Sequence, residues 1–201
     1  LVGSEMCIRD RVYNKYAENE DKPKREIKGD KTLLADPHGV SIDTKNKWLF
    51  VANHGSVVTE DQLGSGRFYP PSITVYPMNA TGEVAPLRVI QGPKTQLNWP
   101  AAMWVEETRG ELYVANDAGD SVLVFKVTDN GDVAPTRTIK GPRTGVKNPT
   151  GVYVDSKNKE VWVSNMGNHR ATVYPIDADG DTPPLRTIRS APNDKLAMAI
   201  G

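Results

Sequence analysis

The sequence has almost no cysteine: the one thiol among its 201 residues belongs to Cys7. A lone cysteine excludes an intramolecular disulfide framework, and the main part of the chain therefore has no thiolate metal site and no cysteine nucleophile. The compartment does not follow from this absence, because a cysteine-free domain is compatible with either redox environment.

The sequence also lacks an excess of charge of one sign, with 25 Lys and Arg against 25 Asp and Glu. Nucleic-acid partners require a basic patch or stripe, so no nucleic acid is expected as a partner. No apolar run approaches the roughly 20 residues that a helix needs to cross a bilayer, so no membrane span is expected. The motifs G-x-S-x-G and H-E-x-x-H and a phosphate-binding loop are missing, so no catalytic residue is predicted.

The first eleven residues, LVGSEMCIRDR, stand apart from the rest of the sequence. In one reading frame they back-translate to DNA that resembles a transposase adapter used in preparing sequencing libraries. We therefore expect residues 1–11 to be a non-native tail, which leaves them out of the fold argument. The alternative is an ordinary N-terminal tail.

A repeat begins directly after that segment. The pattern Pro-x-Arg-x-Ile occurs four times, with intervals of 63, 49 and 49 residues between the prolines. The four prolines are Pro23, Pro86, Pro135 and Pro184. The excess length of the first interval lies between Asn53 and Tyr76, which indicates one loop insertion in a module of otherwise constant length.

Each module contains four short runs of β-branched and aromatic residues separated by polar turns, which predicts four antiparallel strands. A strand-rich repeat of this length is typical of one blade of a β-propeller. A helical repeat is the rival, but glycine and proline recur too often for two helices per module. The predicted fold class is all-β, a β-propeller fragment of about three complete four-stranded blades plus partial ones.

The expected domain organisation follows from the same landmarks. Residues 12–201 are predicted to form an incomplete propeller domain, and the whole protein is expected to be longer, with six or seven blades. The predicted parts are a blade remnant at 12–29, blades at about 37–91, 100–140 and 149–189, and the start of a further blade at 190–201.

Several sequence features resemble bacterial propellers of the NHL and YVTN repeat class. They are P-x-G-V, strands ending in V-A-N, V-Y-P, and G-D-V-A-P-x-R-T-I-x-G-P-x-T, and they extend from Val12 to Ile188. The resemblance implies an extracellular or periplasmic protein whose ligand site lies on the loop face, where the loops before the first strands meet those joining the second and third strands. That class includes binding scaffolds, surface proteins and some enzymes, so the resemblance leaves the activity open.

Eight residues on that expected loop face are candidates for ligand binding. They are His38, His54, Trp99, Asn116, Asp117, Asn165, Asn168 and His169. The insertion after Asn53, which carries Glu60, Asp61, Arg67, Phe68 and Tyr69, is expected to rise from the same face.

Each candidate also has a structural interpretation. The asparagines that end V-A-N and V-S-N recur in every blade, and a recurring residue usually serves the repeat by bonding nearby backbone. Trp99 can pack between blades, and Asp117 with Asp120 can belong to a polar turn or bind a cation. His38 and His54 offer two imidazoles for zinc, but no third ligand follows from their spacing, so no metal ligand is assigned.

Two functions remain open. The first is a non-enzymatic scaffold that binds a protein, glycan or small ligand through the loop face, with no cofactor in this sequence and calcium or zinc conceivable in the full-length protein. The second is a metal-dependent hydrolase that resembles lactonases and gluconolactonases. Such enzymes often carry Pro-Asn-Gly where the first strand begins, and the triplets at Pro37, Pro100 and Pro149 lack that asparagine, which favours the scaffold.

Overall fold

The computed structural model describes residues 9–57 and 67–189. Three four-stranded antiparallel sheets dominate these residues, and in each sheet the strands lie in the order in which they occur in the chain. The predicted all-β fold class with four-stranded blades is therefore confirmed. No helix among the described residues has the length and apolar character needed to span a membrane.

Each blade begins with an inner strand at a proline. The first blade consists of β3 (Pro37–Asp43), β4 (Trp48–Asn53), β7 (Ser72–Pro77) and β8 (Arg88–Ile90). The second consists of β9 (Pro100–Glu106), β10 (Glu111–Asn116), β11 (Ser121–Lys126) and β12 (Arg137–Ile139). The third consists of β13 (Pro149–Asp155), β14 (Glu160–Asn165), β15 (Arg170–Pro175) and β16 (Arg186–Arg189).

Two smaller sheets flank the first blade. One joins β1 (Arg9–Val12) to β2 (Arg25–Lys28), and the other joins β5 (Ser56–Val57) to β6 (Arg67–Phe68) inside the insertion. Short 3-10 turns occur at Asp30–Thr32, Pro93–Thr95, Asp117–Gly119 and Met166–Asn168. The residues expected to start a further blade, 190–201, and the insertion residues Glu60 and Asp61 lie outside the described part of the chain.

The outer strands share one register in every sheet. The valine of the third strand faces the arginine of Pro-x-Arg in the fourth, and the pairs are Val12–Arg25, Val75–Arg88, Val124–Arg137 and Val173–Arg186. Two residues earlier the third strands of the three blades carry Ile73, Val122 and Ala171, and β1 carries Asp10. The repeat pattern is thus present at Val12 and not at Asp10. The non-native origin of residues 1–11 stays a prediction.

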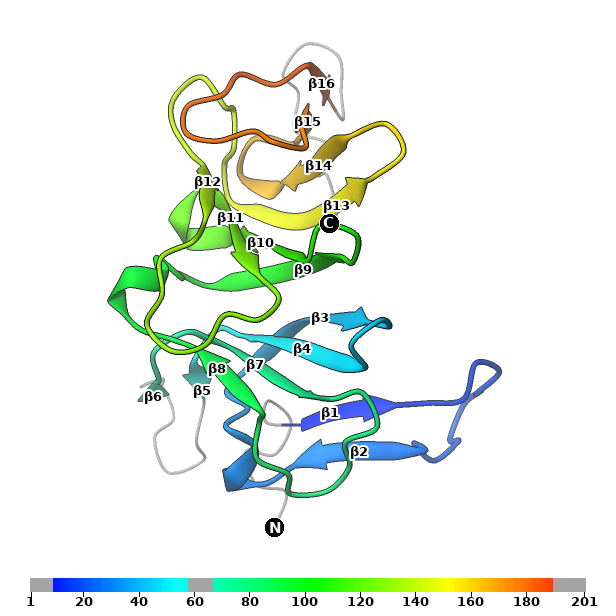
Figure 1. Cartoon of the computed structure of the whole chain (residues 1–201). Coiled ribbons are helices and arrows are strands. Elements are labelled where there is room, and N and C mark those ends of the chain that lie inside the picture. Colours follow the sequence, from blue (N-terminus) through cyan, green and yellow to red (C-terminus); the bar gives the residue numbers. More distant parts are fainter. Residues whose placement is uncertain (1–8, 58–66, 190–201) are drawn as a thin grey trace.

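The cores of the protein lie between blades. One apolar cluster combines side chains of the first and second blades, a second combines the second and third, and a third joins Ile27 and Leu34 to the first blade. In Figure 1 the inner strands β3, β9 and β13 follow one another along one side of the stacked sheets. Neighbouring sheets therefore bury the faces that they turn toward each other, as propeller blades do.

Isolated β-bridges also join consecutive blades. The isoleucines of the outer strands β2, β8 and β12 each form a parallel bridge with a turn glycine of the next blade, and the pairs are Ile27–Gly82, Ile90–Gly131 and Ile139–Gly180. All three glycines have positive φ, a conformation that favours glycine. In the turns of Gly131 and Gly180, the residue after the glycine is an aspartate whose carboxylate accepts a backbone N–H. Asp132 accepts the N–H of Lys94 and Asp181 accepts that of Arg143, both at 2.7 Å.

The arginine of Pro-x-Arg has one of two kinds of partner, a backbone carbonyl of the following blade or a glutamate of its own blade. Arg25 and Arg88 donate to the backbone carbonyls of Met78 and Val127 in the following blade, at 2.6 and 2.9 Å. Arg186 binds Glu160 of its own blade at 2.6 Å. Arg137 approaches a carboxylate of its own blade and one of the following blade, as described next.

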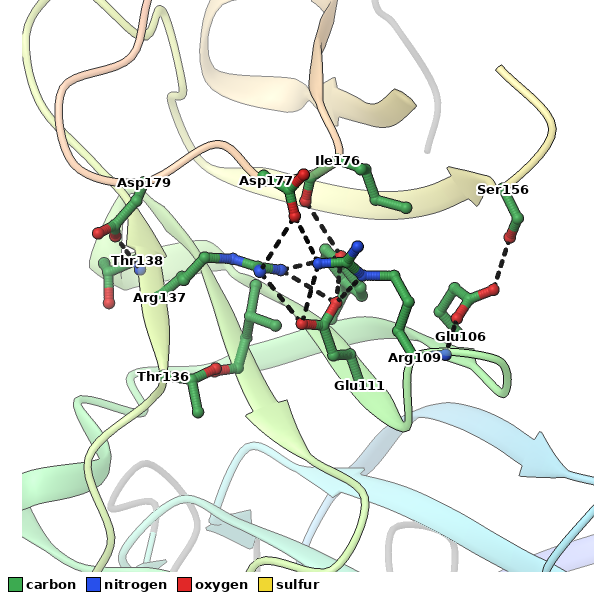
Figure 2. A network of polar contacts seen from close by, with 12 residues as sticks. Glu106, Arg109, Glu111, Thr136, Arg137, Thr138, Ser156, Ile176, Asp177 and Asp179 are labelled. Atoms are coloured by element: carbon green, nitrogen blue, oxygen red, sulfur yellow. Dashed lines mark hydrogen bonds and ion pairs between the residues drawn. The ribbon is translucent and has the colours of Figure 1, made fainter. Parts of the chain in front are cut away.

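Figure 2 shows the ionic network around Arg137. Glu111 at the start of β10 accepts two hydrogen bonds from Arg137, both at 3.1 Å, and two from Arg109 at 2.7 and 3.4 Å. Asp177 of the third blade binds Arg109 at 2.5 Å and lies 3.8 Å from Arg137. These residues lie at the end of the second blade opposite to the loop face, where a groove of about 510 Å³ is lined by Arg109, Glu111, Lys126 and Arg137, among others. The charges are mutually compensated, so we assign this network to blade-to-blade stability.

Glu111→Gln is expected to lower the free energy of unfolding at pH 7 by about 1–2 kcal/mol, the value of a charge-assisted hydrogen-bonded pair. Burial by itself raises the pKa of Glu111, but the hydrogen bonds from Arg109, Arg137 and Tyr113 outweigh it and hold this pKa below its usual value. A carboxylate with a depressed pKa stabilises the fold above its unfolded pKa of about 4.3, and this stabilisation is lost on further acidification.

Guanidinium denaturation of both proteins at pH 7 and pH 3 measures this dependence. The difference between parent and variant should shrink at pH 3. A difference that is equal at both values would contradict an ionised Glu111 in the folded protein.

Candidate functional site

The loop face is built from the same backbone pattern in each blade. The residue before the inner-strand proline has positive φ, and its carbonyl accepts the N–H of the residue that follows the repeated asparagine. The pairs are His54 to Asp36, Asp117 to Trp99 and Met166 to Asn148, each at 3.0 Å. Since the backbone is equivalent and the side chains differ, these positions are where one blade can acquire chemistry that the others lack.

The repeated asparagines hold this pattern in place. Asn116 accepts the N–H of Asn98 at 2.6 Å and donates to the carbonyl of Gln96 and the hydroxyl of Ser121 at 3.0 and 2.9 Å. Asn53 and Asn165 accept the N–H groups of Ala35 and Lys147 in the same way. All three asparagines are fully buried. We therefore place Asn116 and Asn165, two of the candidate ligand contacts, in the framework beneath the site, because their side chains are bonded within the protein.

A stack of three rings lies on this face in the first two blades. The His38 and His54 rings are parallel, with an interplanar angle of 5° and centroids 3.4 Å apart. The ring of Trp99 follows on the other blade, 5.5 Å from His54. Trp99 remains 43% exposed. The structure therefore brings three of the predicted site residues together.

The position of His38 depends on a β-bulge. The pairing of β3 with β4 shifts between Pro37 and Gly39, so His38 is the extra residue. A bulge re-aims the side chain that it carries, and here the His38 ring lies against His54. The equivalent shifts in the other blades fall at alanine and threonine positions, so only the first of the three blades has a histidine there.

His54 is the most enclosed member of the stack. The residue is 8% exposed, and its Nε2 atom is buried without a hydrogen-bond partner. Burial lowers the pKa of His54 to about 4, and the adjacent His38 acts in the same direction, while Asp36 opposes both. The imidazole of His54 is therefore neutral at neutral pH and keeps an unused ring nitrogen.

Asp36 completes this cluster, and the sequence did not indicate it as a site residue. Its Oδ1 atom lies 3.3 Å from Nε2 of His38. One ligand atom from each of Asp36, His38 and His54 lies within 4.8 Å of the others. The signal that could have found it is local: Asp36 stands two residues before His38, on the opposite side of the strand-opening proline.

The other predicted residues have local partners. Asp117 accepts a hydrogen bond from the Asn148 side chain at 3.1 Å, and Asp120 binds Lys147 at 2.6 Å and the N–H of Asn148 at 2.8 Å. These two carboxylates thus link the second blade to the third. Asn168 of the third blade donates to the carbonyl of Gly145 at 2.8 Å.

His169 follows Asn168 and has left-handed backbone geometry, with a φ of 55°. It thus occupies the loop of the third blade, whereas the ring stack is formed by the first two. Of the insertion, Tyr69 is exposed and its N–H binds the carbonyl of Gly55 at 2.7 Å.

Comparison with known proteins supports the fold. No family model matches the chain, and no curated protein matches its sequence. Among solved structures, the chain is similar to the periplasmic gluconolactonase PpgL of Pseudomonas aeruginosa, with 16% identity and a TM-score of 0.60 over 88% of this chain and 48% of that one. It is also similar to the WD40 β-propeller domain of Doa1, with 11% identity and a TM-score of 0.54 over 88% and 47%.

A protein from Lactobacillus plantarum is a third such structure, with 15% identity and a TM-score of 0.55 over 92% of this chain and 53% of that one. The chain thus spans about half the length of each of these proteins. At these identities the similarity concerns the fold alone. The chain is a β-propeller repeat protein, and its neighbours in structure include both a WD40 domain and a gluconolactonase.

Proposed function

We propose that this chain is a propeller scaffold that binds a ligand through its loop face, at the ring stack of His38, His54 and Trp99. The observation that carries the proposal is Trp99, a large aromatic side chain that stays 43% exposed although its ring stacks on His54. Tryptophan is enriched among the residues that dominate binding energy, because it offers a large rigid surface at low entropic cost.

The surroundings of the stack support this reading. The loops that carry it are held by buried asparagines and by backbone bonds between His54 and Asp36 and between Asp117 and Trp99. A site on a rigid frame loses little conformational entropy when it binds. The proposed ligand is a glycan, a protein or a small molecule, and assignment to the NHL and YVTN class with an extracellular or periplasmic location belongs to the same proposal.

The test uses an array of immobilised glycans and peptides probed with the labelled protein, followed by calorimetry on the strongest binder. Trp99→Ala is expected to weaken that binding by roughly 10–30-fold, which corresponds to the loss of an aromatic anchor worth about 2 kcal/mol. Leu87→Ala is the control, since Leu87 is similarly exposed at 52% but precedes the outer strand β8. Equal binding by both variants would rule out the ring stack at Trp99 as the binding site.

A metal-dependent lactonase-like hydrolase is the second candidate. One observation favours it, namely the carboxylate and two imidazoles gathered on the loop face. A lactone substrate panel assayed with and without added zinc separates the two candidates. Turnover that depends on Asp36 and the metal would support the hydrolase, and ligand binding without turnover would support the scaffold.

A further inference from the structure

We propose that Asp36, His38 and His54 form a binding site for a divalent transition-metal ion of the zinc class. This inference goes beyond the proposed scaffold, which requires no metal. It rests on the position of three ligand-type side chains from two segments of the first blade, and on a buried ring nitrogen that nothing in the protein satisfies.

The distances suit such an ion. Two ligands of a tetrahedral zinc ion with bonds of about 2.0–2.1 Å lie about 3.3 Å apart. Asp36 Oδ1 and His38 Nε2 are 3.3 Å apart, and all three ligand atoms lie within 4.8 Å of one another. Ligand atoms that lie up to 4.8 Å apart must therefore approach each other by up to about 1.5 Å, which requires a change in side-chain torsion angles.

The parallel rings show which side chain must move. The lone pairs of an imidazole lie in the plane of its ring, so two stacked rings do not aim at one ion while they remain parallel. His54 is enclosed, whereas the His38 side chain is 44% exposed. Binding would thus tilt the His38 ring away from its 5° alignment and leave His54 in place.

His54 supports the metal site in a way that is independent of the clustering of polar residues. Its Nε2 atom is buried without a hydrogen-bond partner, and an unsatisfied buried polar atom costs free energy. A metal ion bound at this nitrogen would satisfy it without a proton. The site thus explains why a polar ring is retained at a position that is 8% exposed.

The donor set indicates the class of metal. Two imidazoles and one carboxylate suit zinc, copper, iron, cobalt or nickel, whereas calcium and magnesium prefer all-oxygen sites. Three protein ligands leave at least one coordination position open, as in catalytic rather than structural zinc sites. An external ligand atom could occupy that position on the loop face.

The protein backbone places these ligands before any ion binds. Asp36 and His54 are joined by the bond from the His54 N–H to the Asp36 carbonyl, and the adjacent Asn53 accepts the N–H of Ala35. His38 is aimed by the bulge at the start of β3. Affinity should therefore depend on the ligand side chains rather than on ordering of the loop.

The experiment uses the full chain with Cys7→Ser as the background, because a thiol also binds zinc. Bound zinc is measured by elemental analysis after dialysis, and affinity by calorimetry and by the visible absorption of bound Co²⁺. About one ion per chain is expected. His38→Ala and Asp36→Asn should each weaken binding by at least about 10–100-fold, the loss seen when even a partner of a metal ligand is removed.

His169→Ala is the matched control, since it removes the remaining one of the three histidines and leaves the cluster intact. It should keep the metal. His38 is exposed, so its variant should fold, and circular dichroism verifies this. Equal zinc binding by His38→Ala and the background, no zinc bound by the folded background, or equal loss in His169→Ala would overturn the proposal. Repeating the ligand array in the presence of EDTA separates the two proposals, because Trp99-dependent binding that survives EDTA leaves the scaffold standing without the metal.

Discussion

Asn116→Ala is expected to lower the free energy of unfolding by about 3 kcal/mol, one of the two largest effects we anticipate for a single substitution. The side chain is fully buried and makes three hydrogen bonds, to the Asn98 N–H, the Gln96 carbonyl and the Ser121 hydroxyl. Alanine would leave these groups without their partner: the bond to Ser121 is buried and the other two are partly buried, and a buried unsatisfied group costs about 1–3 kcal/mol. Structural relaxation and water molecules that replace the lost partner offset part of this total cost. We therefore expect a loss of about 3 kcal/mol rather than more.

Guanidinium denaturation measures the effect, and the repeat supplies the comparisons. Asn53→Ala and Asn165→Ala remove the equivalent side chains and should behave alike, because both accept the backbone N–H from the loop before their inner strand. Asn98→Ala is the control, since its exposed side chain makes one bond, to the Ala118 carbonyl at 3.2 Å, and should cost no more than about 1 kcal/mol. A loss below that value for Asn116→Ala would contradict its role as the anchor of the loop face.

The fold could be predicted from the sequence because the same pattern of strand and turn residues recurs in each module. Short runs of β-branched and aromatic residues specify strands, and turn residues at constant spacing specify where the strands end. The shared register of Val75 with Arg88 and Val124 with Arg137 follows from that constancy. The fourfold occurrence of Pro-x-Arg predicted the sheets but not the arginine's partner, because the first residue of the second strand is Trp48 in the first blade and a glutamate, Glu111 or Glu160, in the other two.

The site was only partly predictable for a related reason. A residue that recurs in every blade, such as Asn116, serves the blade, whereas chemistry resides where equivalent positions differ, as at Asp36, Trp99 and Asn148. The sequence identified His38 and His54 as residues that share a face. It places Asp36 two residues before His38 but does not show that the side chains meet, because the left-handed backbone before Pro37 and the bulge after it decide that contact.

Gly39→Ala is expected to be the other severe substitution, with a loss of about 3 kcal/mol, at the upper end of what overpacking costs. A Cβ atom at Gly39 would lie 2.2 Å from the carbonyl oxygen of Ala101, on the inner strand of the next blade. That contact is between backbones of adjacent blades, so relief requires β3 and β9 to separate. Because His38 precedes Gly39, the same movement should disturb the His38–His54 stack and reduce zinc affinity.

Gly82→Ala distinguishes this close approach from a general intolerance of alanine at glycine positions. Gly82 has a φ of 75°, which disfavours alanine, but a Cβ atom there would have no neighbour within 4 Å, so about 1 kcal/mol of backbone strain is expected. Gly39 is not in the left-handed region, so its cost arises from the neighbouring strand alone. Thermal and guanidinium unfolding of both variants measure the two losses of stability. If Gly39→Ala is no less stable than Gly82→Ala, the inner strands are not packed backbone to backbone. The placement of His38 beside His54 would then lose its support.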